Sequence, residues 1–217
     1  MTDNIDKNDV IRAMLVHVPF DGWTSEAMDA AADDLGIERA AVSGLFPQGV
    51  ASTIDAFVAM SDEDMARAFA ELEVRPQGVT ATIKALIMIR LDGAAPYREA
   101  VSMALKALGR PQHAALGLRI LYRTVDRMWR LAGDRSVDFN FYSKRALLAG
   151  VYSATLAYWA ANPSADREKL ERFVSQRLRE VAFFPKVTAP ARKAATVGVQ
   201  MVGRMIGRLS PPWVRPF

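Results

Sequence analysis

The sequence contains no cysteine and only two histidines, His17 and His113, among its 217 residues. Without cysteine the chain has no disulfide framework, no thiolate zinc site and no cysteine nucleophile. Neither an ExxH nor an HExxH spacing occurs, so the ligand pattern of a helical di-iron or zinc site is missing. There is no Walker loop, no GxGxxG after a strand and no GxSxG elbow. We therefore expect no catalytic residues, no bound metal and no enzymatic activity.

Long apolar runs are missing as well. The longest uncharged stretch, residues 146–165, is cut by Asn162-Pro163-Ser164, which leaves 16 helical residues, 146–161. A spanning helix needs about 20 apolar residues, so we interpret this stretch as a helix buried in protein. The N-terminal sequence MTDNIDKNDV is acidic and polar, unlike a secretory signal or a transit peptide. These features predict a soluble protein of a reducing compartment.

Charge is distributed unevenly along the chain. Residues 1–75 carry 15 acidic and 5 basic residues, residues 76–185 carry 9 and 17, and residues 186–217 carry six bases and no acid. The net charge of +4 therefore combines an acidic front with a basic rear. Such an asymmetry indicates partners of different sign at different places on the chain.

Helical periodicity dominates the sequence, and runs of β-branched residues at strand length are scarce. The spacing predicts an all-α fold of about ten helices. They are expected near residues 9–18, 25–35, 38–45, 52–72, 79–91, 96–108, 111–131, 136–161, 166–183 and 191–209. Pro19, Gly36, Asp92-Gly93 and Gly133 are the expected stops, Ser25 is an expected N-cap, and Ser61 marks a break. The acids Asp62-Glu63-Asp64 are interpreted as a solvated helix start.

The first three helices predict a helix-turn-helix over residues 1–50. The stretch from Gly22-Trp23-Thr24 to Gly44-Leu45-Phe46-Pro47 resembles the N-terminal domain of TetR-type regulators, which implies a helical ligand-binding domain behind it, residues 51–185. Residues 21–50 hold six acids against Arg39 alone, whereas a DNA-binding module must neutralise phosphates. We predict no nucleic-acid partner and a packing or protein-docking role. A ligand-responsive TetR-type repressor is the alternative.

The helices over residues 79–91, 111–131 and 136–161 are rich in large apolar side chains. They must bury these faces against each other or around a ligand, and the sequence leaves a filled core and a lipid cavity both open. The candidate lipid-binding residues are Leu86, Met88, Leu121, Met128, Trp129, Leu148, Tyr152, Leu156 and Trp159.

Residues 128–145, MWRLAGDRSVDFNFYSKR, gather charged and aromatic groups around one helix–helix corner. Phe139, Phe141 and Tyr142 cannot all point inward, because adjacent helical positions diverge by about 100°. An exposed aromatic beside Lys144 and Arg145 has the composition of a protein–protein hot spot.

With the front GWT…A…LG and GLFPxG, this central motif resembles the TetR-fold lipid-binding accessory proteins of ubiquinone (coenzyme Q) biosynthesis, whose mitochondrial members are known as the ninth coenzyme-Q protein. The likeness extends from about residue 8 to about residue 205. It implies a non-catalytic protein that binds an isoprenoid quinone intermediate and presents it to a di-iron demethoxyubiquinone hydroxylase. No cofactor other than this bound lipid is implied, and the same layout allows a homodimer.

The resemblance also implies where the partner docks. The matching positions are Asp134, Asp138, Asn140, Phe141, Tyr142, Lys144 and Arg145. Some mitochondrial relatives have Trp where Phe141 stands, so this chain lacks the indole donor there. The lack of a transit peptide indicates a bacterial member, cytoplasmic and peripheral at the inner membrane.

Residues 186–217 form a predicted linker and amphipathic helix. One helical face is apolar and the other carries the bases, which is the pattern of an interfacial helix. Packing of this helix on the body or on a second subunit is the alternative. The candidate membrane-binding residues are Val197, Met201, Val202, Met205, Ile206, Leu209 and Trp213.

Overall fold

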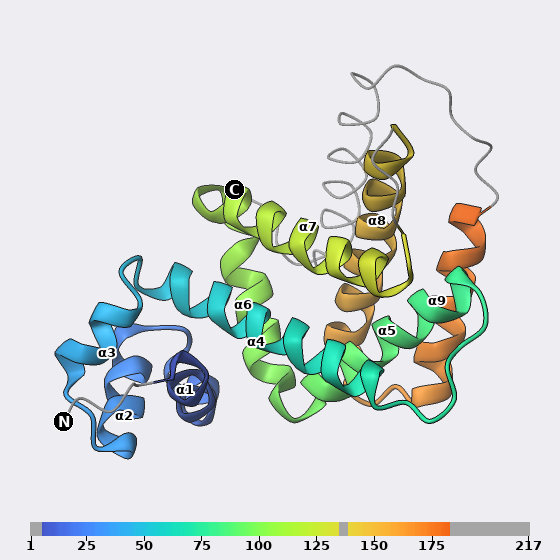
Figure 1. The fold of residues 1–217 in the computed structure, drawn as a ribbon. Coiled ribbons are helices and arrows are strands. Elements are labelled where there is room, and N and C mark those ends of the chain that lie inside the picture. The colour runs from blue at the N-terminus through green and yellow to red at the C-terminus, as the bar shows by residue number, and fades with distance from the viewer. Residues whose placement is uncertain (1–5, 135–138, 183–217) are drawn as a thin grey trace, which may run out of the picture. The chain divides into compact units, whose positions relative to one another are not determined.

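The computed structural model describes residues 6–134 and 139–182, with the backbone alone at residues 139–141 and 182. Within these ranges the chain forms nine α-helices and two 3-10 helices without any strand, which confirms the predicted all-α fold (Figure 1). The helices are α1 (Lys7–Asp21), α2 (Ser25–Leu35), α3 (Arg39–Leu45), α4 (Val50–Ala70), α5 (Val79–Ala94), η1 (Ala95–Tyr97), α6 (Arg98–Leu108), η2 (Pro111–His113), α7 (Ala114–Leu131), α8 (Phe139–Ala161) and α9 (Arg167–Ala182).

Two predicted glycine stops, Gly36 and Gly133, are confirmed. Gly36 ends α2 with φ 63°, and its N–H donates to the carbonyl oxygens of Ala32 and Asp33. Gly133 has φ 84°, and the following Asp134 N–H donates to Trp129 O at 3.0 Å. This is the pattern of a helix end closed by a left-handed glycine, which lacks the Cβ that strains other residues there.

Four other predicted boundaries are wrong. α1 continues through Pro19 to Asp21 and is capped by Gly22 (φ 72°), because proline's fixed φ is helical and only one hydrogen bond is lost near the helix end. α5 continues through Asp92-Gly93 to Ala94, where Leu91 and Ala94 are buried. Thr24, not Ser25, caps α2 by accepting from Ala27 N–H. α4 is unbroken at Ser61, whose hydroxyl donates to Phe57 O at 2.8 Å.

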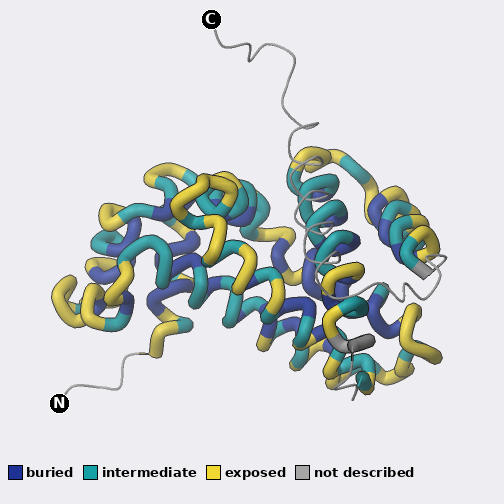
Figure 2. The backbone as a smooth tube through the Cα atoms, turned by 90° about the horizontal axis from the view of Figure 1, so that it is seen from above, coloured by how far each residue is buried: buried dark blue, intermediate teal, exposed yellow. Residues whose placement is uncertain are grey.

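The chain divides into two compact units. The first comprises residues 1–75 and 85–124, and the second residues 76–84 and 125–217, so α5 and α7 each contribute to both. The boundaries predicted at residues 50 and 185 stay predictions. Figure 2 shows buried and exposed residues alternating along the helices, as expected of amphipathic helices that each bury one face.

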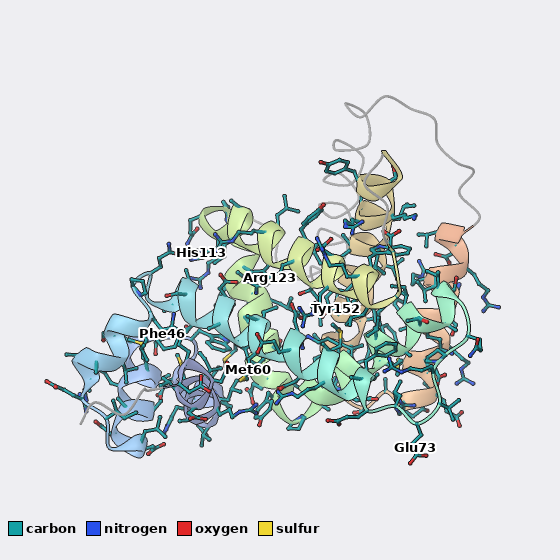
Figure 3. All side chains as sticks on the ribbon, in the orientation of Figure 1. Phe46, Met60, Glu73, His113, Arg123 and Tyr152 are labelled. Carbon is teal, nitrogen blue, oxygen red and sulfur yellow. The ribbon has the colours of Figure 1, made fainter. Side chains whose placement is uncertain are left out.

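The first unit contains the helix-turn-helix, formed by α1, α2 and α3. Trp23 fixes its position, because the buried indole N–H donates to Ala100 O in α6 at 2.9 Å and the ring lies 5.2 Å from that of Phe57 in α4. Figure 3 shows the same division between core and surface: Glu73 points away from the helices, whereas the buried Phe46 and Met60 lie among neighbouring side chains.

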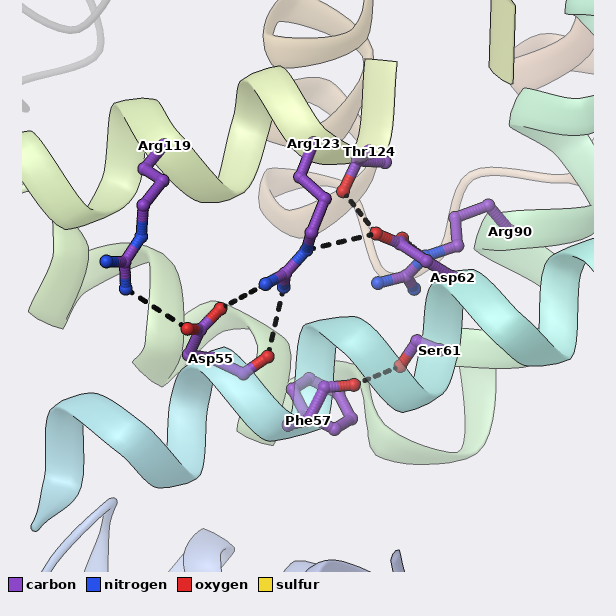
Figure 4. A network of polar contacts seen from close by, with 8 residues as sticks. All are labelled: Asp55, Phe57, Ser61, Asp62, Arg90, Arg119, Arg123 and Thr124. Carbon is purple, nitrogen blue, oxygen red and sulfur yellow. Dashed lines mark hydrogen bonds and ion pairs between the residues drawn. The ribbon is translucent and has the colours of Figure 1, made fainter. Parts of the chain in front are cut away.

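A buried polar cluster joins α4, α5 and α7 within this unit (Figure 4). Asp62 is buried, receives a hydrogen bond from Arg90 Nε at 3.1 Å and another from Thr124 Oγ1 at 2.8 Å, and lies 4.0 Å from Arg123 Nε. Burial raises the pKa of Asp62, against the lowering effect of Arg90, Thr124 and Arg123. The interpretation of Asp62 as part of a solvated helix start is therefore wrong, because α4 begins at Val50 and turns this residue inward.

The second unit is built from the start of α5, the end of α7, α8 and α9. Tyr158 of α8 stacks on Phe173 of α9 with ring centroids 4.3 Å apart and planes at 8°. Lys84 of α5 pairs with Glu171 of α9 at 2.8 Å. None of the described helices combines the length and the apolar character needed to cross a bilayer.

Candidate partner-binding site

The predicted docking corner lies between the end of α7 and the start of α8, in the second unit. Asp134, Tyr142, Lys144 and Arg145 are described with their side chains. The backbone of Asn140 and Phe141 lies in the first turn of α8. Asp138 lies outside the described residues, as do all seven candidate membrane-binding residues of the tail.

Arg145 is the centre of this corner. Its side chain is only 2% exposed, and its Nε donates to Asp126 Oδ1 at 2.6 Å while Nη1 donates to Asp134 Oδ2 at 3.2 Å. Asp126 belongs to α7 and Asp134 follows the Gly133 turn, so the Arg145 guanidinium connects α8 both to α7 and to the turn after it. The rigid fork of an arginine suits such a two-carboxylate site, whereas lysine offers one point charge.

Each carboxylate also has a second base. Arg130 Nε donates to Asp126 Oδ2 at 2.6 Å from an exposed position, and Lys144 Nζ donates to Asp134 Oδ1 at 2.8 Å. Burial opposes the charged form of Asp126, yet the hydrogen bonds and charges of Arg130 and Arg145 outweigh it and lower its pKa. The corner is therefore closed by a set of coupled ion pairs rather than by isolated surface pairs.

Trp129 and Lys144 make a second connection between the two helices. The indole N–H of Trp129 donates to Lys144 O at 3.1 Å, and Lys144 Nζ lies 5.6 Å from the centroid of the same ring. The ammonium group over the ring face is a cation–π contact. Trp129 thus contacts α8 through its polar edge, and we find it at the corner rather than deep in the interior.

The predicted docking residues therefore differ in accessibility. Tyr142 is 67% exposed and Lys144 is partly exposed, whereas Arg145 and the Asp134 carboxylate are buried. Tyr142 and Lys144 are placed to contact another molecule, while Arg145 and Asp134 hold the corner in shape. The partner-binding role of the whole set stays a prediction.

Sequence reasoning missed Asp126, which the structure places at the centre of the same network. The signal was available, because Asp126 is the only acid between Ala114 and Leu131. A lone carboxylate on a helix with four arginines indicates an ion-pair partner from another element.

The candidate lipid-binding residues fall into both units. Leu86, Met88 and Leu121 belong to the first, and the other six to the second. Most are buried, with Leu121, Trp129 and Leu156 partly exposed. The second unit also contains an open groove of about 530 Å³ between the start of α5 and the end of α9, and none of the nine residues lines it. Their role stays a prediction.

Residues 21–50 contain a single base, Arg39. Arg39, at the start of α3, donates from Nε and Nη2 to Asp33 at 3.0 and 2.6 Å and lies 3.7 Å from Asp29. The only cation of residues 21–50 is therefore already paired with α2. Across the described residues no group of three or more acids and histidines is arranged to hold a metal ion.

Comparison with known proteins finds similarity to a protein family. The COQ9 family model matches residues 114–184, which contain α7, α8 and α9. "Ubiquinone biosynthesis protein COQ9, mitochondrial" of Rattus norvegicus is 31% identical over 205 residues, covering 91% of this chain and 64% of the relative. The Homo sapiens protein of the same name is 30% identical, with 91% and 63% covered. The chain is thus similar to COQ9 proteins over most of its own length, and to the COQ9 family model over α7, α8 and α9.

This similarity agrees with the resemblance found on the sequence motif. This chain spans less than two thirds of the length of these two relatives. A crystal structure of a TetR transcriptional regulator from Nitrosomonas europaea superposes with a TM-score of 0.61, at 19% identity, covering 81% of this chain and 97% of the regulator. At that identity the likeness establishes the TetR-like fold alone.

Proposed function

We propose that this chain, which is similar to COQ9 proteins, is a non-catalytic accessory protein of ubiquinone biosynthesis. In this proposal it binds an isoprenoid quinone intermediate and presents it to a di-iron demethoxyubiquinone hydroxylase at the membrane. Support for the pathway comes from the relatives, which are named as ubiquinone biosynthesis proteins.

The α7–α8 corner is the observation that carries the docking part of the proposal. A protein-binding surface benefits from a rigid support, because ordering flexible side chains on binding costs affinity. Here Arg145 binds two carboxylates within the corner, and Tyr142 extends from it with most of its surface exposed. A large aromatic on a fixed helix, beside an exposed lysine, is suited to act as the anchor of an interface.

The paired Arg39 argues against the alternative of a DNA-binding repressor. Affinity for a duplex rests largely on neutralising phosphates. A phosphate would have to displace Asp33 and Asp29 from Arg39, in a region that carries six acids. The helix-turn-helix is therefore proposed as a structural unit.

Tyr142→Ala tests the docking part, with Phe20→Ala as the matched control. Both residues are exposed aromatics on helices, 67% and 87% exposed, but Phe20 lies on α1 in the other unit. Immobilised full-length chain is used to capture the purified hydroxylase. We expect Tyr142→Ala to weaken capture about 30-fold, the effect of losing one interfacial hot spot, and Phe20→Ala to leave it unchanged. Equal capture by both variants would remove the docking assignment.

The lipid-binding part is tested separately by native mass spectrometry of protein purified from cells. Bound isoprenoid lipid, or uptake of quinone when it is offered, is the expected result. Protein that stays empty under both conditions would contradict lipid presentation while leaving the docking result unaffected.

A further inference from the structure

A second surface with a distinct chemistry lies on the first half of α7, in the first unit. Leu118 is 60% exposed and Tyr122 38% exposed, and Ala114 and Ala115 are exposed one turn earlier. At 100° per residue these four side chains fall within an arc of about 100° on the helix. We refer to them as the α7 patch. None of the residues of the α7 patch belongs to the docking corner or to residues 186–217.

The α7 patch is held on a fixed support. Ile120 and Thr124 are buried on another face of the same helix, so α7 is packed into the unit while the patch faces outward. Gly117 lies directly against the end of α6, where an added Cβ would come within 3.4 Å of Leu108. Two large apolar side chains presented by a packed helix indicate a contact surface rather than a frayed end.

The surroundings of the patch are basic. Residues 100–125 contain Lys106, Arg110, Arg119 and Arg123 and no acid, and Asp126, one turn after Tyr122, is paired with Arg130 and Arg145. Lys106 and Arg110 are exposed and have no ion-pair partner among the described residues.

The three arginines of the polar cluster in Figure 4 add to this charge. Arg119 and Arg123 both pair with Asp55, and Arg90 pairs with Asp62. Three guanidinium groups thus share two carboxylates, which leaves one positive charge. Together with Lys106 and Arg110, these groups therefore carry a net positive charge.

A second exposed apolar pair, on α1, differs from the α7 patch in the charge around it. Val16 and Phe20 on α1 have the same four-residue spacing as Leu118 and Tyr122 and are more exposed. Asp9 lies on the same side of α1 and Asp21 directly follows Phe20, while Arg12, one turn before Val16, is paired with Asp64 at 3.6 Å. An anionic surface would be repelled there and attracted at the α7 patch.

We propose that the α7 patch, together with Lys106 and Arg110 near the end of α6, is a binding surface for an anionic lipid membrane. It goes beyond the membrane contact predicted for residues 186–217, because it assigns a lipid surface to the folded part of the chain. Leu118 and Tyr122 would enter the headgroup boundary, where a tyrosine places its ring in the apolar layer and its hydroxyl in water. The bases would lie over the anionic headgroups.

The test measures binding of full-length chain to vesicles of equal parts phosphatidylglycerol and phosphatidylcholine, by sedimentation. Leu118→Ser/Tyr122→Ser should bind about tenfold more weakly. The matched Val16→Ser/Phe20→Ser variant should bind as the unsubstituted chain does. Lys106→Gln/Arg110→Gln should lose about fivefold per base at low salt and should show a smaller loss as salt screens the headgroups. Circular dichroism checks that each variant folds. If the double variant does not fold, Leu118→Ser alone is used in its place.

The outcomes separate this surface from the proposed function. Equal binding by the two serine pairs, or failure of the unsubstituted chain to bind these vesicles, would overturn the membrane surface on α7. Unchanged vesicle binding together with lost capture of the hydroxylase would also overturn it, and would assign the patch to a protein partner instead. If capture of the hydroxylase depends on Tyr142 and not on the α7 patch, the docking proposal stays in place whichever vesicle result is obtained.

Discussion

Replacement of Arg145 by methionine tests the idea that the docking corner is held by a buried ion network. Methionine keeps much of the volume and removes the charge. Its matched control is Arg130→Met, because both arginines bind the same carboxylate, Asp126, with Nε–O distances of 2.6 Å. The two differ in exposure: the Arg130 side chain is 67% exposed and the Arg145 side chain 2%.

The magnitudes follow from that difference. Removing one member of a buried ion pair costs about 3–5 kcal/mol, because the remaining charge stays buried. Asp126 and Asp134 keep Arg130 and Lys144, so we expect the low end, about 3 kcal/mol. For the exposed Arg130 we expect no more than about 0.5 kcal/mol, the value of a helical surface pair. One kilocalorie shifts the melting temperature of a chain of this size by about 2–4 °C.

Thermal unfolding followed by circular dichroism at 222 nm therefore separates the two variants. Arg145→Met should melt about 6–12 °C below the unsubstituted chain, and Arg130→Met within about 2 °C of it. Equal melting temperatures for the two variants would refute the reasoning, since they would show that burial adds nothing to the Arg145 pairs. Arg145→Met should also weaken capture of the hydroxylase, because Tyr142 loses its fixed support.

Three further predictions concern charge elsewhere in the chain. Asp62→Asn should destabilise the chain by about 3 kcal/mol in urea unfolding, because it leaves Arg90 buried without an anion. Asp62→Leu/Arg90→Met removes both charges and should come within about 1 kcal/mol of the unsubstituted chain. A double variant as unstable as the single one would contradict the buried Asp62–Arg90 ion pair. Because the folded chain lowers the pKa of Asp126, its stabilising contribution is complete above about pH 4 and is lost as the pH falls through the folded-state pKa. As the pH falls from about 6 to about 2.5, the midpoint of urea unfolding should fall less for Arg145→Met than for the unsubstituted chain. Midpoints that fall in parallel for the two proteins would argue against Asp126 as the source of the lost stability. In a gel-shift series at low salt the full chain should leave a random duplex unshifted, and tight binding would restore the repressor alternative.

The sequence was sufficient for the fold because its signals are local. Apolar residues at helical spacing place the nine α-helices of residues 6–134 and 139–182, and a glycine with positive φ marks the end of α2 and the turn after α7. Proline and Asp-Gly were poor stops, because the packing of neighbouring side chains decides whether a helix continues through them. The end of α5 is an example, since burial of Leu91 and Ala94 carries the helix past Asp92-Gly93.

The candidate site was predictable in its location but not in its internal roles. The motif over residues 128–145 marks the α7–α8 corner, yet no pattern within it separates the buried Arg145 from the neighbouring Lys144. That distinction depends on which side of α8 faces Asp126, a residue outside the motif. Asp62 was misread for the same reason, because its partners Arg90 and Thr124 lie on other helices.

The central claim is that this chain docks on the hydroxylase through a surface anchored by Tyr142. Its most direct test is a binding titration of the purified hydroxylase with full-length chain and with Tyr142→Ala. The account predicts a saturable complex for the unsubstituted chain and an affinity about 30-fold lower for the variant. Binding curves that coincide for the two proteins, or no complex up to about 100 µM, where fewer than 6 kcal/mol of binding free energy would be available, would contradict it.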